Sequence, residues 1–293
     1  MKIFSLDYPG KHISPKDKNT LLSFFAKMER NAVVLYPEPC DEQLPVGTSK
    51  EGGKPDVPPD FVWPTFEGED AKGKRAIRPL SFLAQINLKE VKPFDTENLL
   101  PDTGLLSFFY EISTLRSGGE PEDDGCARVY YFPDDNLAPR DFPSELHPTY
   151  IIPLASLSFS AESSLPSYSE YVGESSITLP RYNETALEYG ISVYIPYAKT
   201  HKLLGYGELY RSSILPDCVL AEKGLSFADT VCMTWMERAE LEKREKDYIL
   251  LSQFGSLSKA CPFGNCGCIF FYILKEDLKN KRFDRVYFCL QNA

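Results

Sequence analysis

The sequence predicts an α+β fold, internally duplicated, with mainly antiparallel strands arranged as two related meander halves and a few flanking helices. Three observations predict it: strand-like apolar runs dominate, helical periodicity is confined to a few segments, and one set of strand motifs occurs twice. Hydrophobic residues make up 43% and charged residues 25% of the 293 residues, which supplies a sizeable core. We therefore expect a single compact domain whose halves span 1–150 and 151–293.

The repeated motifs define two repeat cores, 80–132 and 248–291. The first contains LSFLAQINL, GLLSFFYEI and CARVYYF, and the second contains YILLSQF, GCIFFYI and RVYFCLQ. Four matches occur in the same order: Gln85 with Gln253, Gly104 with Gly267, Phe108-Phe109 with Phe271-Tyr272, and Arg128-Val129-Tyr130 with Arg285-Val286-Tyr287. Two copies are too few for a solenoid, so each core is expected to form one three-stranded meander.

Before the first core, the sequence predicts one helix and one strand. Ser14 suits the N-cap, Pro15 suits the first helical position, and an apolar face runs from Leu21 to Met28. The β-branched run AVVLYP at 32–37 predicts a strand. Residues 47–79 are rich in glycine, proline and charge, which predicts a long irregular loop.

Between the cores the pattern is less regular. Residues 150–179 are rich in serine and predict loops with short strands, and ISVYIPY at 191–197 predicts a strand. A helix is expected between Ser226 and Lys246, with Ser226 and Asp229 as its capping box.

Charge and hydropathy exclude several classes of partner. The formal net charge is −10, and no basic run is long enough to follow a nucleic-acid backbone. No apolar run approaches the ~18 residues of a membrane span, and the start, MKIFSLDYPGKHISP, lacks the apolar region of a signal peptide. We therefore expect a cytoplasmic protein with mostly reduced thiols and no nucleic-acid or membrane partner. An acidic surface would suit a basic partner.

Several of these segments together resemble the YwqG-like family of bacterial domains of unknown function. They are GGKPDVPPDFVWP, PLSFLAQINL, LPDTGLLSFFY, HKLLGYG, LLSQF and GCIFFYILKEDL, and they extend from Lys50 to the C-terminus. The resemblance implies an α+β fold with an internal duplication, and it implies no established reaction. The chain departs from the family pattern at Tyr248, at Asn265-Cys266 and at Tyr210-Arg211. A ligand site at those positions in relatives would differ here or be absent.

The two strand glutamines are the first candidate site residues. Alternation along a strand places Gln85 on the same face as Leu83, and Gln253 on the same face as Leu251. A buried amide without partners costs about 1–3 kcal/mol, so each glutamine should be hydrogen-bonded. Either each one anchors a neighbouring loop or strand, or both line a groove between the halves around a pseudo-twofold axis.

Two glycine-rich loops are expected to frame such a groove. Gly52 and Gly53 allow positive φ and close backbone approach. Trp63, His201 and Tyr206 would supply walls with polar tips. The alternative interpretation of the glycines is simple tight-turn chemistry. No GxxxxGK[ST] or GxGxxG phosphate-binding loop occurs in the chain.

The sequence CPFGNCGC brings three thiols together, those of Cys261, Cys266 and Cys268. Its C-x4-C-x-C spacing matches no standard zinc module, so no metal site and no cofactor are expected. The three thiols remain the alternative metal ligands. Core packing and a reactive thiol in a glycine-rich turn are the other interpretations.

No GxSxG elbow, HExxH or nucleotide-binding signature indicates a reaction. The sequence therefore favours a binding protein over an enzyme, with an unknown protein, peptide or small polar ligand held in the groove between the halves. A protein that neutralises a toxin or effector is one version of this hypothesis. The alternative is an enzyme acting on a small molecule or peptide, with Cys261, Cys266, Cys268 or His201 in the same groove.

Overall fold

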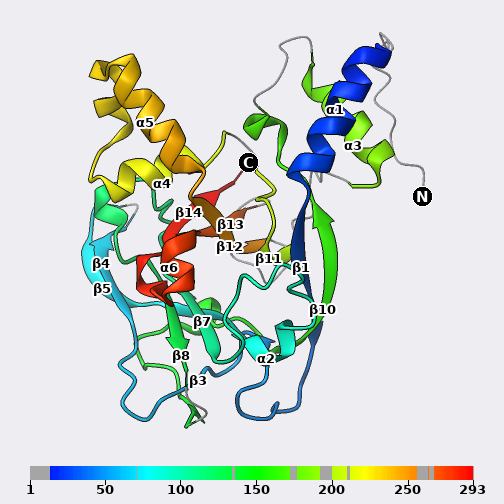
Figure 1. Ribbon diagram of the computed structural model, residues 1–293. Helices are drawn as coiled ribbons and strands as arrows, with labels where there is room; N and C mark the ends of the chain where they lie inside the picture. The colour runs from blue at the N-terminus through cyan, green and yellow to red at the C-terminus, as the bar shows by residue number, and fades with distance from the viewer. Residues whose placement is uncertain are drawn as a thin grey trace.

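The computed structural model describes residues 14–70, 72–133, 136–171, 177–191, 200–209, 212–255, 263 and 267–292. Its main feature is one ten-stranded sheet in which all neighbouring strands are antiparallel (Figure 1). The strands, in spatial order, are β14 (Tyr287–Gln291), β13 (Cys268–Leu274), β12 (Tyr248–Gly255), β11 (His201–Leu204), β1 (Arg30–Pro39), β10 (Ala155–Ser164), β2 (Lys50–Glu51), β6 (Ser81–Asn87), β7 (Leu105–Tyr110) and β8 (Ala127–Phe132). The expected α+β fold with a large antiparallel sheet is confirmed.

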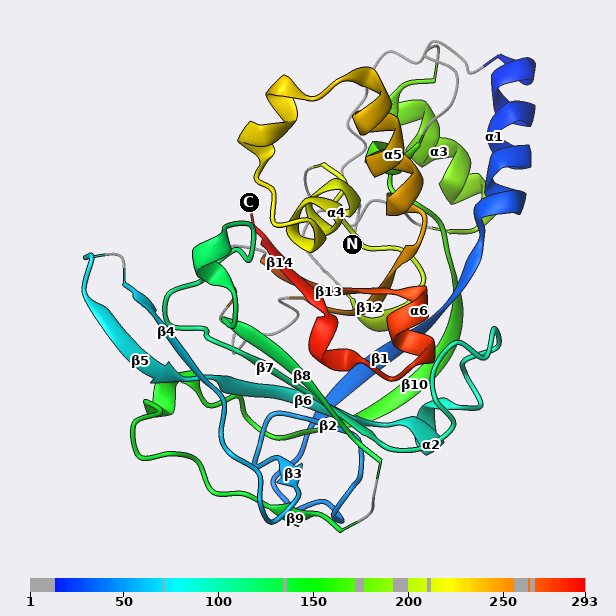
Figure 2. The same cartoon turned by 60° about the vertical axis from the view of Figure 1, so that its left-hand side comes forward.

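Helices and two small sheets surround this sheet. Two helical lobes stand at one end of the molecule, and α1 and α3 form one of them while α4 and α5 form the other (Figures 1 and 2). The helices are α1 (Pro15–Met28), α2 (Leu88–Val91), α3 (Leu179–Tyr189), α4 (Leu215–Glu222), α5 (Trp235–Glu245) and α6 (Lys275–Lys279). Single turns of 3-10 helix are η1 (Pro121–Asp123), η2 (Pro148–Tyr150), η3 (Tyr168–Glu170) and η5 (Phe283–Arg285), and η4 (Phe227–Cys232) is longer. The small sheets pair β3 (Asp56–Val57) with β9 (Ala138–Pro139), and β4 (Thr65–Glu69) with β5 (Arg75–Pro79).

The order of the strands reads the same from both edges of the sheet. Each edge carries a three-stranded meander, followed by a short strand and then a ten-residue strand. The two long strands, β1 and β10, pair along their whole length at the centre. β1 also pairs with β11, and β10 also pairs with β2. The long strand of each half is therefore hydrogen-bonded to the short strand of the other half.

The sheet is so strongly curved that its two meanders face each other. Phe108 on β7 contacts Phe254 and Phe271, with ring centroids 5.2 Å apart in both cases. Tyr110 on β7 contacts Phe288 on β14 at 4.6 Å. These aromatic rings belong to one hydrophobic cluster that contains side chains from both meanders, so the core lies inside a nearly barrel-shaped sheet.

A β-bulge interrupts the alternation of side chains in both glutamine strands. The register shifts between Phe82 and Ala84 in β6, and between Leu250 and Ser252 in β12. Leu251 and Phe254 therefore belong to the central core, whereas Leu250 packs in a separate cluster against α4. The extra residue of a bulge moves the preceding side chains of the strand to the opposite face of the sheet. The expectation that Gln253 shares a face with Leu251 is consequently wrong.

The elements with local sequence signals were predicted well. α1 begins at Pro15, and the backbone N–H of Asp17 donates to the Ser14 hydroxyl at 3.1 Å. All six strands of the two repeat cores are present within two residues of their expected bounds. The fourth sequence match is wrong, because the strand register sets Val129 opposite Phe108 and Phe288 opposite Phe271. Arg285 lies instead in the single turn η5.

The middle of the chain was predicted less well. The serine-rich stretch contains the ten-residue central strand β10, and the expected loop at 47–79 contains the short strands β2 to β5. The helix expected over 226–246 is two elements, η4 and α5, because a second capping box of Thr234 and Glu237 starts the latter. All but the first residue of the strand expected at 191–197 lies outside the described residues.

Candidate functional site

Gln85 is the centre of a buried hydrogen-bonded group, called here the first cluster: Thr48, Lys50, Asp56 and Gln85. The Gln85 amide nitrogen donates to the Thr48 carbonyl at 2.8 Å and to the Asp56 carboxylate at 2.6 Å. Its amide oxygen accepts from the Asp56 backbone N–H at 2.9 Å. The Lys50 ammonium forms an ion pair with the Asp56 carboxylate at 3.0 Å. The cluster therefore ties the loop before β3 to strand β6.

Gln253 has the same role in the second cluster: Thr200, Lys202, Glu208 and Gln253. Its amide nitrogen donates to the Thr200 carbonyl at 2.9 Å and to the Glu208 carboxylate at 3.0 Å. Its amide oxygen accepts from the Glu208 backbone N–H at 2.8 Å. Lys202 is paired with Glu208 at 3.2 Å. Threonine, lysine and acid have the spacing T-x-K-x5-[DE] in both clusters, a signal that the sequence analysis missed.

The two glutamines do not face each other. Strands β6 and β12 are separated in the sheet by β2, β10, β1 and β11, and each amide is bonded to its own neighbouring loop. The anchoring interpretation accounts for both residues, because both are fully buried and hydrogen-bonded at each end. The sequence does not predict this separation, because it depends on which strands lie between β6 and β12 in the sheet.

The glycine-rich loops are tight turns at corresponding places of the two clusters. Gly52 and Gly53 have φ of 61° and 65°, and Leu204 and Gly205 have φ of 61° and 69°. A Cβ on Gly53 would lie 2.9 Å from the Leu154 side chain, and one on Gly205 would lie 2.8 Å from the Ala32 side chain. Positive φ and close packing both favour glycine here.

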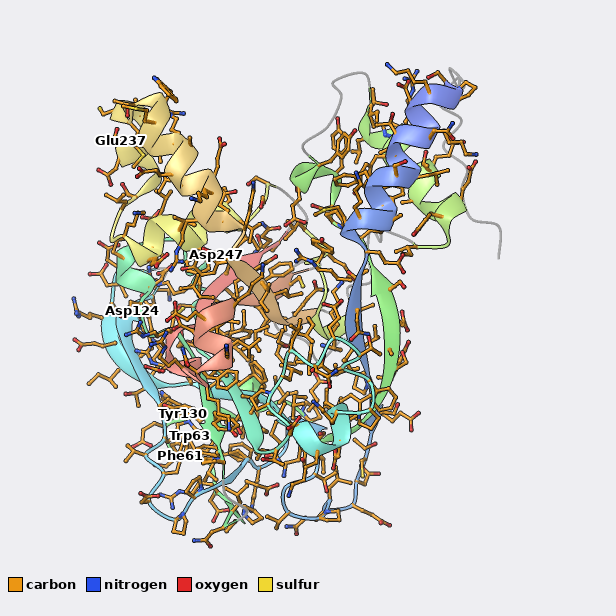
Figure 3. All side chains as sticks on the ribbon, viewed as in Figure 1. Phe61, Trp63, Asp124, Tyr130, Glu237 and Asp247 are labelled. Atoms are coloured by element: carbon orange, nitrogen blue, oxygen red, sulfur yellow. The ribbon has the colours of Figure 1, made fainter. Side chains whose placement is uncertain are left out.

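Trp63 covers the outer face of the first meander. Its indole N–H donates to the Leu80 carbonyl at 2.9 Å, and its ring contacts Phe61 and Phe109. Trp63, Phe61 and Tyr130 lie together (Figure 3), and the Phe61 ring contacts both of the others. Tyr206 lies elsewhere, beside the second cluster, and its hydroxyl donates to the Met28 carbonyl at 2.7 Å.

His201 points into the curved sheet, where its imidazole Nε2 lies 4.0 Å from a Glu51 carboxylate oxygen. Burial lowers the pKa of His201 to about 4 and raises the pKa of Glu51 to about 7. The His201 Nδ1 atom has no hydrogen-bond partner among the described residues. The imidazole also lies against the Phe254 ring at 5.8 Å. Between about pH 4 and about pH 7, both side chains are therefore neutral inside the core.

The cysteines give no metal site within the described part of the chain. Cys261 and Cys266 lie outside the described residues, and Cys268 is fully buried in the cluster under α4. No group of three or more histidine, cysteine or acidic side chains in the described ranges is placed to hold a metal ion.

A groove lies between the first half and the second half, with a volume of about 650 Å³. The turn η1 and strand β8 form one wall, and α4, η4 and β14 form the other. Among the described residues that line it, four are acidic and one is basic: Glu120, Asp123, Asp124, Asp217 and Arg128. We call it the inter-half groove. The sequence predicts a groove between the halves but indicates none of these residues as its lining.

One large apolar side chain is exposed at the rim of the inter-half groove, and three more are exposed in the residues that follow it along the chain. Phe227 lines the groove and is 77% exposed, and Trp235, nearby at the start of α5, is also 77% exposed. Val231 and Met236 are exposed in the same segment. α5 has no buried residue, and it is joined to α4 through Arg244, which donates two hydrogen bonds to Glu222. The groove thus combines negative charge with an exposed aromatic rim.

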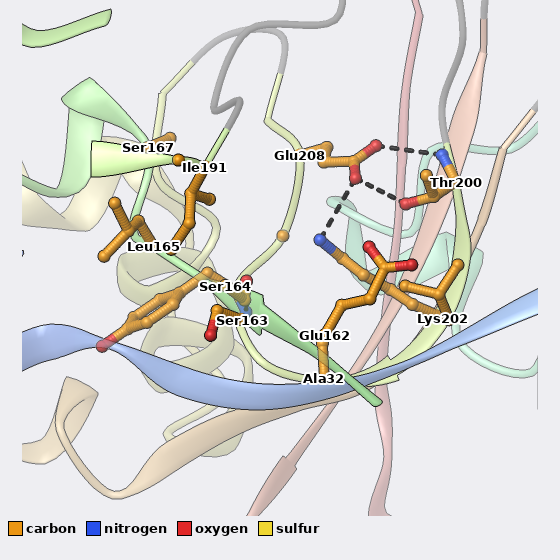
Figure 4. Close-up of a pocket in the computed structure, with 14 residues that line it drawn as sticks. Ala32, Glu162, Ser163, Ser164, Leu165, Ser167, Ile191, Thr200, Lys202 and Glu208 are labelled. Atoms are coloured by element: carbon orange, nitrogen blue, oxygen red, sulfur yellow. Dashed lines mark hydrogen bonds and ion pairs between the residues drawn. The ribbon is translucent and has the colours of Figure 1, made fainter. Parts of the chain in front are cut away.

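A second cavity, of about 350 Å³, opens beside the second cluster (Figure 4). Lys202 and Glu208 line it together with Thr200, Tyr206 and Glu162. We call it the Lys202 pocket. Of the seven site residues expected from sequence, Tyr206 lines this pocket, and none lines the inter-half groove.

Fold and site together define an α+β protein with one curved antiparallel sheet, two buried threonine–lysine–acid–glutamine clusters and two polar cavities. The chain belongs to the family called domain of unknown function DUF1963, whose model matches residues 49–291. Lysine, acid and glutamine of both clusters lie inside this match. No curated protein matches the chain. Within the described residues, every helix is too short or too polar to cross a membrane.

Proposed function

We propose that this protein is a non-catalytic binding protein, and that the inter-half groove holds a basic, partly apolar segment of another protein. The observation that carries the proposal is the groove itself, with four acidic side chains in its walls and Phe227 exposed at its rim. Acidic walls attract and orient a basic segment, and exposed aromatic side chains are enriched at protein interfaces. Four large apolar side chains exposed within 227–236 exceed what scattered surface residues explain.

Two of the four acidic side chains of the groove are already paired with arginine, whereas Glu120 and Asp217 form no ion pair with a described residue. Asp123 is bonded to Arg116 at 3.3 Å, and Asp124 is 3.6 Å from Arg128. Burial raises the pKa of Asp217, and a cationic partner would stabilise its charged form by forming an ion pair. A protein that neutralises a basic toxin or effector is one version of this function.

We also propose that the halves 1–150 and 151–293 are copies of one ancestral unit, and that the narrower YwqG-like resemblance applies. Support comes from the repeated T-x-K-x5-[DE] spacing, the paired bulges and the matching positive φ angles. The groove would then lie where two related meanders meet, a place where ligands commonly bind.

One observation favours an enzyme as a second candidate. His201 and Glu51 place a base and an acid 4.0 Å apart in the core, beyond direct hydrogen-bond reach, and both are residue types used in general acid–base catalysis. Neither residue lines the inter-half groove or the Lys202 pocket, so no cavity among those two brings a substrate to them. An activity that H201N removes and that a groove variant keeps would favour this candidate.

The binding proposal is tested by site-specific photo-crosslinking. The photoreactive amino acid p-benzoylphenylalanine replaces the exposed groove residue Ala228, and the modified protein is irradiated in a lysate of its host. The matched control carries the same group in place of Leu187, an apolar residue on α3 that is 66% exposed. We expect one adduct from the groove position alone, through a partner segment that contains lysine or arginine.

Two further measurements make the result specific. The adduct should weaken at about 0.5 M salt, because screening shortens the reach of the acidic walls. It should also be lost when Phe227 and Trp235 are both replaced by serine, changes that leave an exposed segment folded. Equal adducts from both positions, an acidic captured segment or no groove-specific adduct would contradict the proposal.

A further inference from the structure

The Lys202 pocket contains one ammonium group whose hydrogen-bonding capacity is not fully used. Lys202 is 5% exposed and is bonded to Glu208 at 3.2 Å. A lysine ammonium donates three hydrogen bonds, and this is the one formed with a described residue. The Glu208 carboxylate, by contrast, also accepts from Thr200 and Gln253. The remaining donors of Lys202 therefore face a cavity in which the nearest acid is already occupied.

A second charged group stands at the mouth of the pocket. Glu162 is exposed on β10, and one of its carboxylate oxygens accepts from the hydroxyls of Tyr36 and Ser160. Its other oxygen has no partner among the described residues. Figure 4 shows the Glu162 and Lys202 side chains extending into the same space. The pocket thus offers one set of free donors and one free acceptor.

The rest of the pocket combines four apolar side chains with the hydroxyl groups of Ser163, Ser164, Ser167, Thr200 and Tyr206. Ala32, Val34, Leu165 and Ile191 line it. Ala32 packs against the Gly205 turn as Leu154 packs against the Gly53 turn in the other half. Leu154 is therefore the larger side chain at the Gly53 turn, where the corresponding residue at the Gly205 turn is Ala32. The two clusters therefore share the glutamine and lysine bonds to the acid, and of the two lysines Lys202 lines this pocket.

We propose that the Lys202 pocket binds a free aliphatic α-amino acid. Its carboxylate would accept from the Lys202 ammonium, its ammonium would donate to Glu162, and its side chain would contact Val34 and Leu165. The volume of about 350 Å³ lies at the small end of the range found for ligand sites. This pocket shares no lining residue with the inter-half groove, so the inference does not depend on the proposed function.

Isothermal titration calorimetry with three probes of the same hydrocarbon shape tests the charge pattern. L-leucine carries both charges, 4-methylpentanoate lacks the ammonium, and 3-methylbutylamine lacks the carboxylate. We expect L-leucine to bind about tenfold or more tightly than either other probe, because each lacks one charge-assisted contact. Equal affinities for the three probes, or no heat of binding with L-leucine, would overturn the proposal.

Matched variants then locate the site. K202M should reduce L-leucine affinity by about tenfold or more, whereas K50M should leave it unchanged, since Lys50 has the same ion pair in the closed first cluster. A32L should abolish binding by filling the pocket, and it introduces the side chain that Leu154 supplies at the corresponding Gly53 turn. E162Q should weaken L-leucine binding and leave 4-methylpentanoate binding unchanged. Equal losses in K202M and K50M, or full binding by folded A32L, would overturn the assignment.

Discussion

Gln85 and Asp56 exchange two hydrogen bonds, one from the Asp56 backbone N–H to the amide oxygen at 2.9 Å and one from the amide nitrogen to the Asp56 carboxylate at 2.6 Å. Gln253 and Glu208 exchange the corresponding bonds at 2.8 and 3.0 Å. Each glutamine thereby supplies hydrogen-bond partners to backbone groups of a loop that would otherwise be buried and unpaired next to the sheet. The glutamines are structural anchors, and the chemistry of interest lies in the cavities beside them.

Replacing either anchor should destabilise the fold. Q85L removes the partners of the Asp56 N–H and the Thr48 carbonyl, and Q253L does the same at Glu208 and Thr200. Two buried polar groups without partners cost about 2–4 kcal/mol in the free energy of unfolding. Urea unfolding measures the loss. Q43L, at an exposed position, is the control and should stay within about 0.5 kcal/mol. A loss in Q85L no larger than in Q43L would contradict the anchoring role.

Replacing Gly52 by alanine should destabilise the fold by more than a positive φ alone explains. A Cβ there would lie 2.3 Å from the Pro153 carbonyl oxygen, whereas one on Gly224, with φ of 65°, meets nothing within 4 Å. G224A should cost about 1–2 kcal/mol from backbone strain alone. G52A should exceed about 3 kcal/mol because backbone must also move. Comparing the two unfolding midpoints checks this, and equal losses would show that the turn can relax.

Glu51 should make stability fall as pH rises. Its pKa is about 7 in the folded protein and 4.5 ordinarily, so the folded state binds an extra proton between these values. Stability from this group is therefore lost as pH rises from about 4.5 through 7. E51Q, which cannot ionise, should be more stable than the unsubstituted protein by about 2–3 kcal/mol at about pH 8 and show little difference at about pH 4. Thermal unfolding across this range is the measurement, and a pH-independent difference would contradict it.

His201 should have the opposite pH dependence. Its pKa of about 4 lies below the ordinary 6.5, so the unfolded chain binds the extra proton between these values. Stability from this group is lost as pH falls from about 6.5 through 4. H201N should therefore reduce the loss of stability on acidification, and urea unfolding at several pH values would reveal it. A steeper acid loss in H201N would mean that the imidazole is protonated in the folded protein.

Arg244 should control the local stability of α5. Its guanidinium contacts Glu222 on α4 and Asp247 after α5, while no residue of α5 itself is buried. R244A should speed amide hydrogen exchange across α5 and change global stability by about 1 kcal/mol or less, as for other surface ion pairs. R75A, which removes the Glu67 pair between β4 and β5, should leave exchange in α5 unchanged. Uniform acceleration across the protein in R244A would contradict this.

The sequence by itself determined the local elements. α1 followed from Ser14 and Pro15, and the two meanders followed from aromatic and β-branched runs, because caps and alternation are properties of neighbouring residues. It also indicated that each buried glutamine needs partners. The repeated T-x-K-x5-[DE] spacing was present as well, and it would have named Asp56 and Glu208 as those partners.

Only the tertiary structure decided how these elements meet. Backbone hydrogen bonds join β1 to β10 across more than a hundred residues, and such bonds leave no mark on the side-chain pattern. That pairing separates Gln85 from Gln253 in the sheet. Curvature of the sheet brings Asp124, which follows the turn η1, and Asp217 on α4 into the walls of one groove. Likewise, Ala32 and Leu154 occupy corresponding places only because each packs against its own glycine turn, and Ala32 there lines the Lys202 pocket.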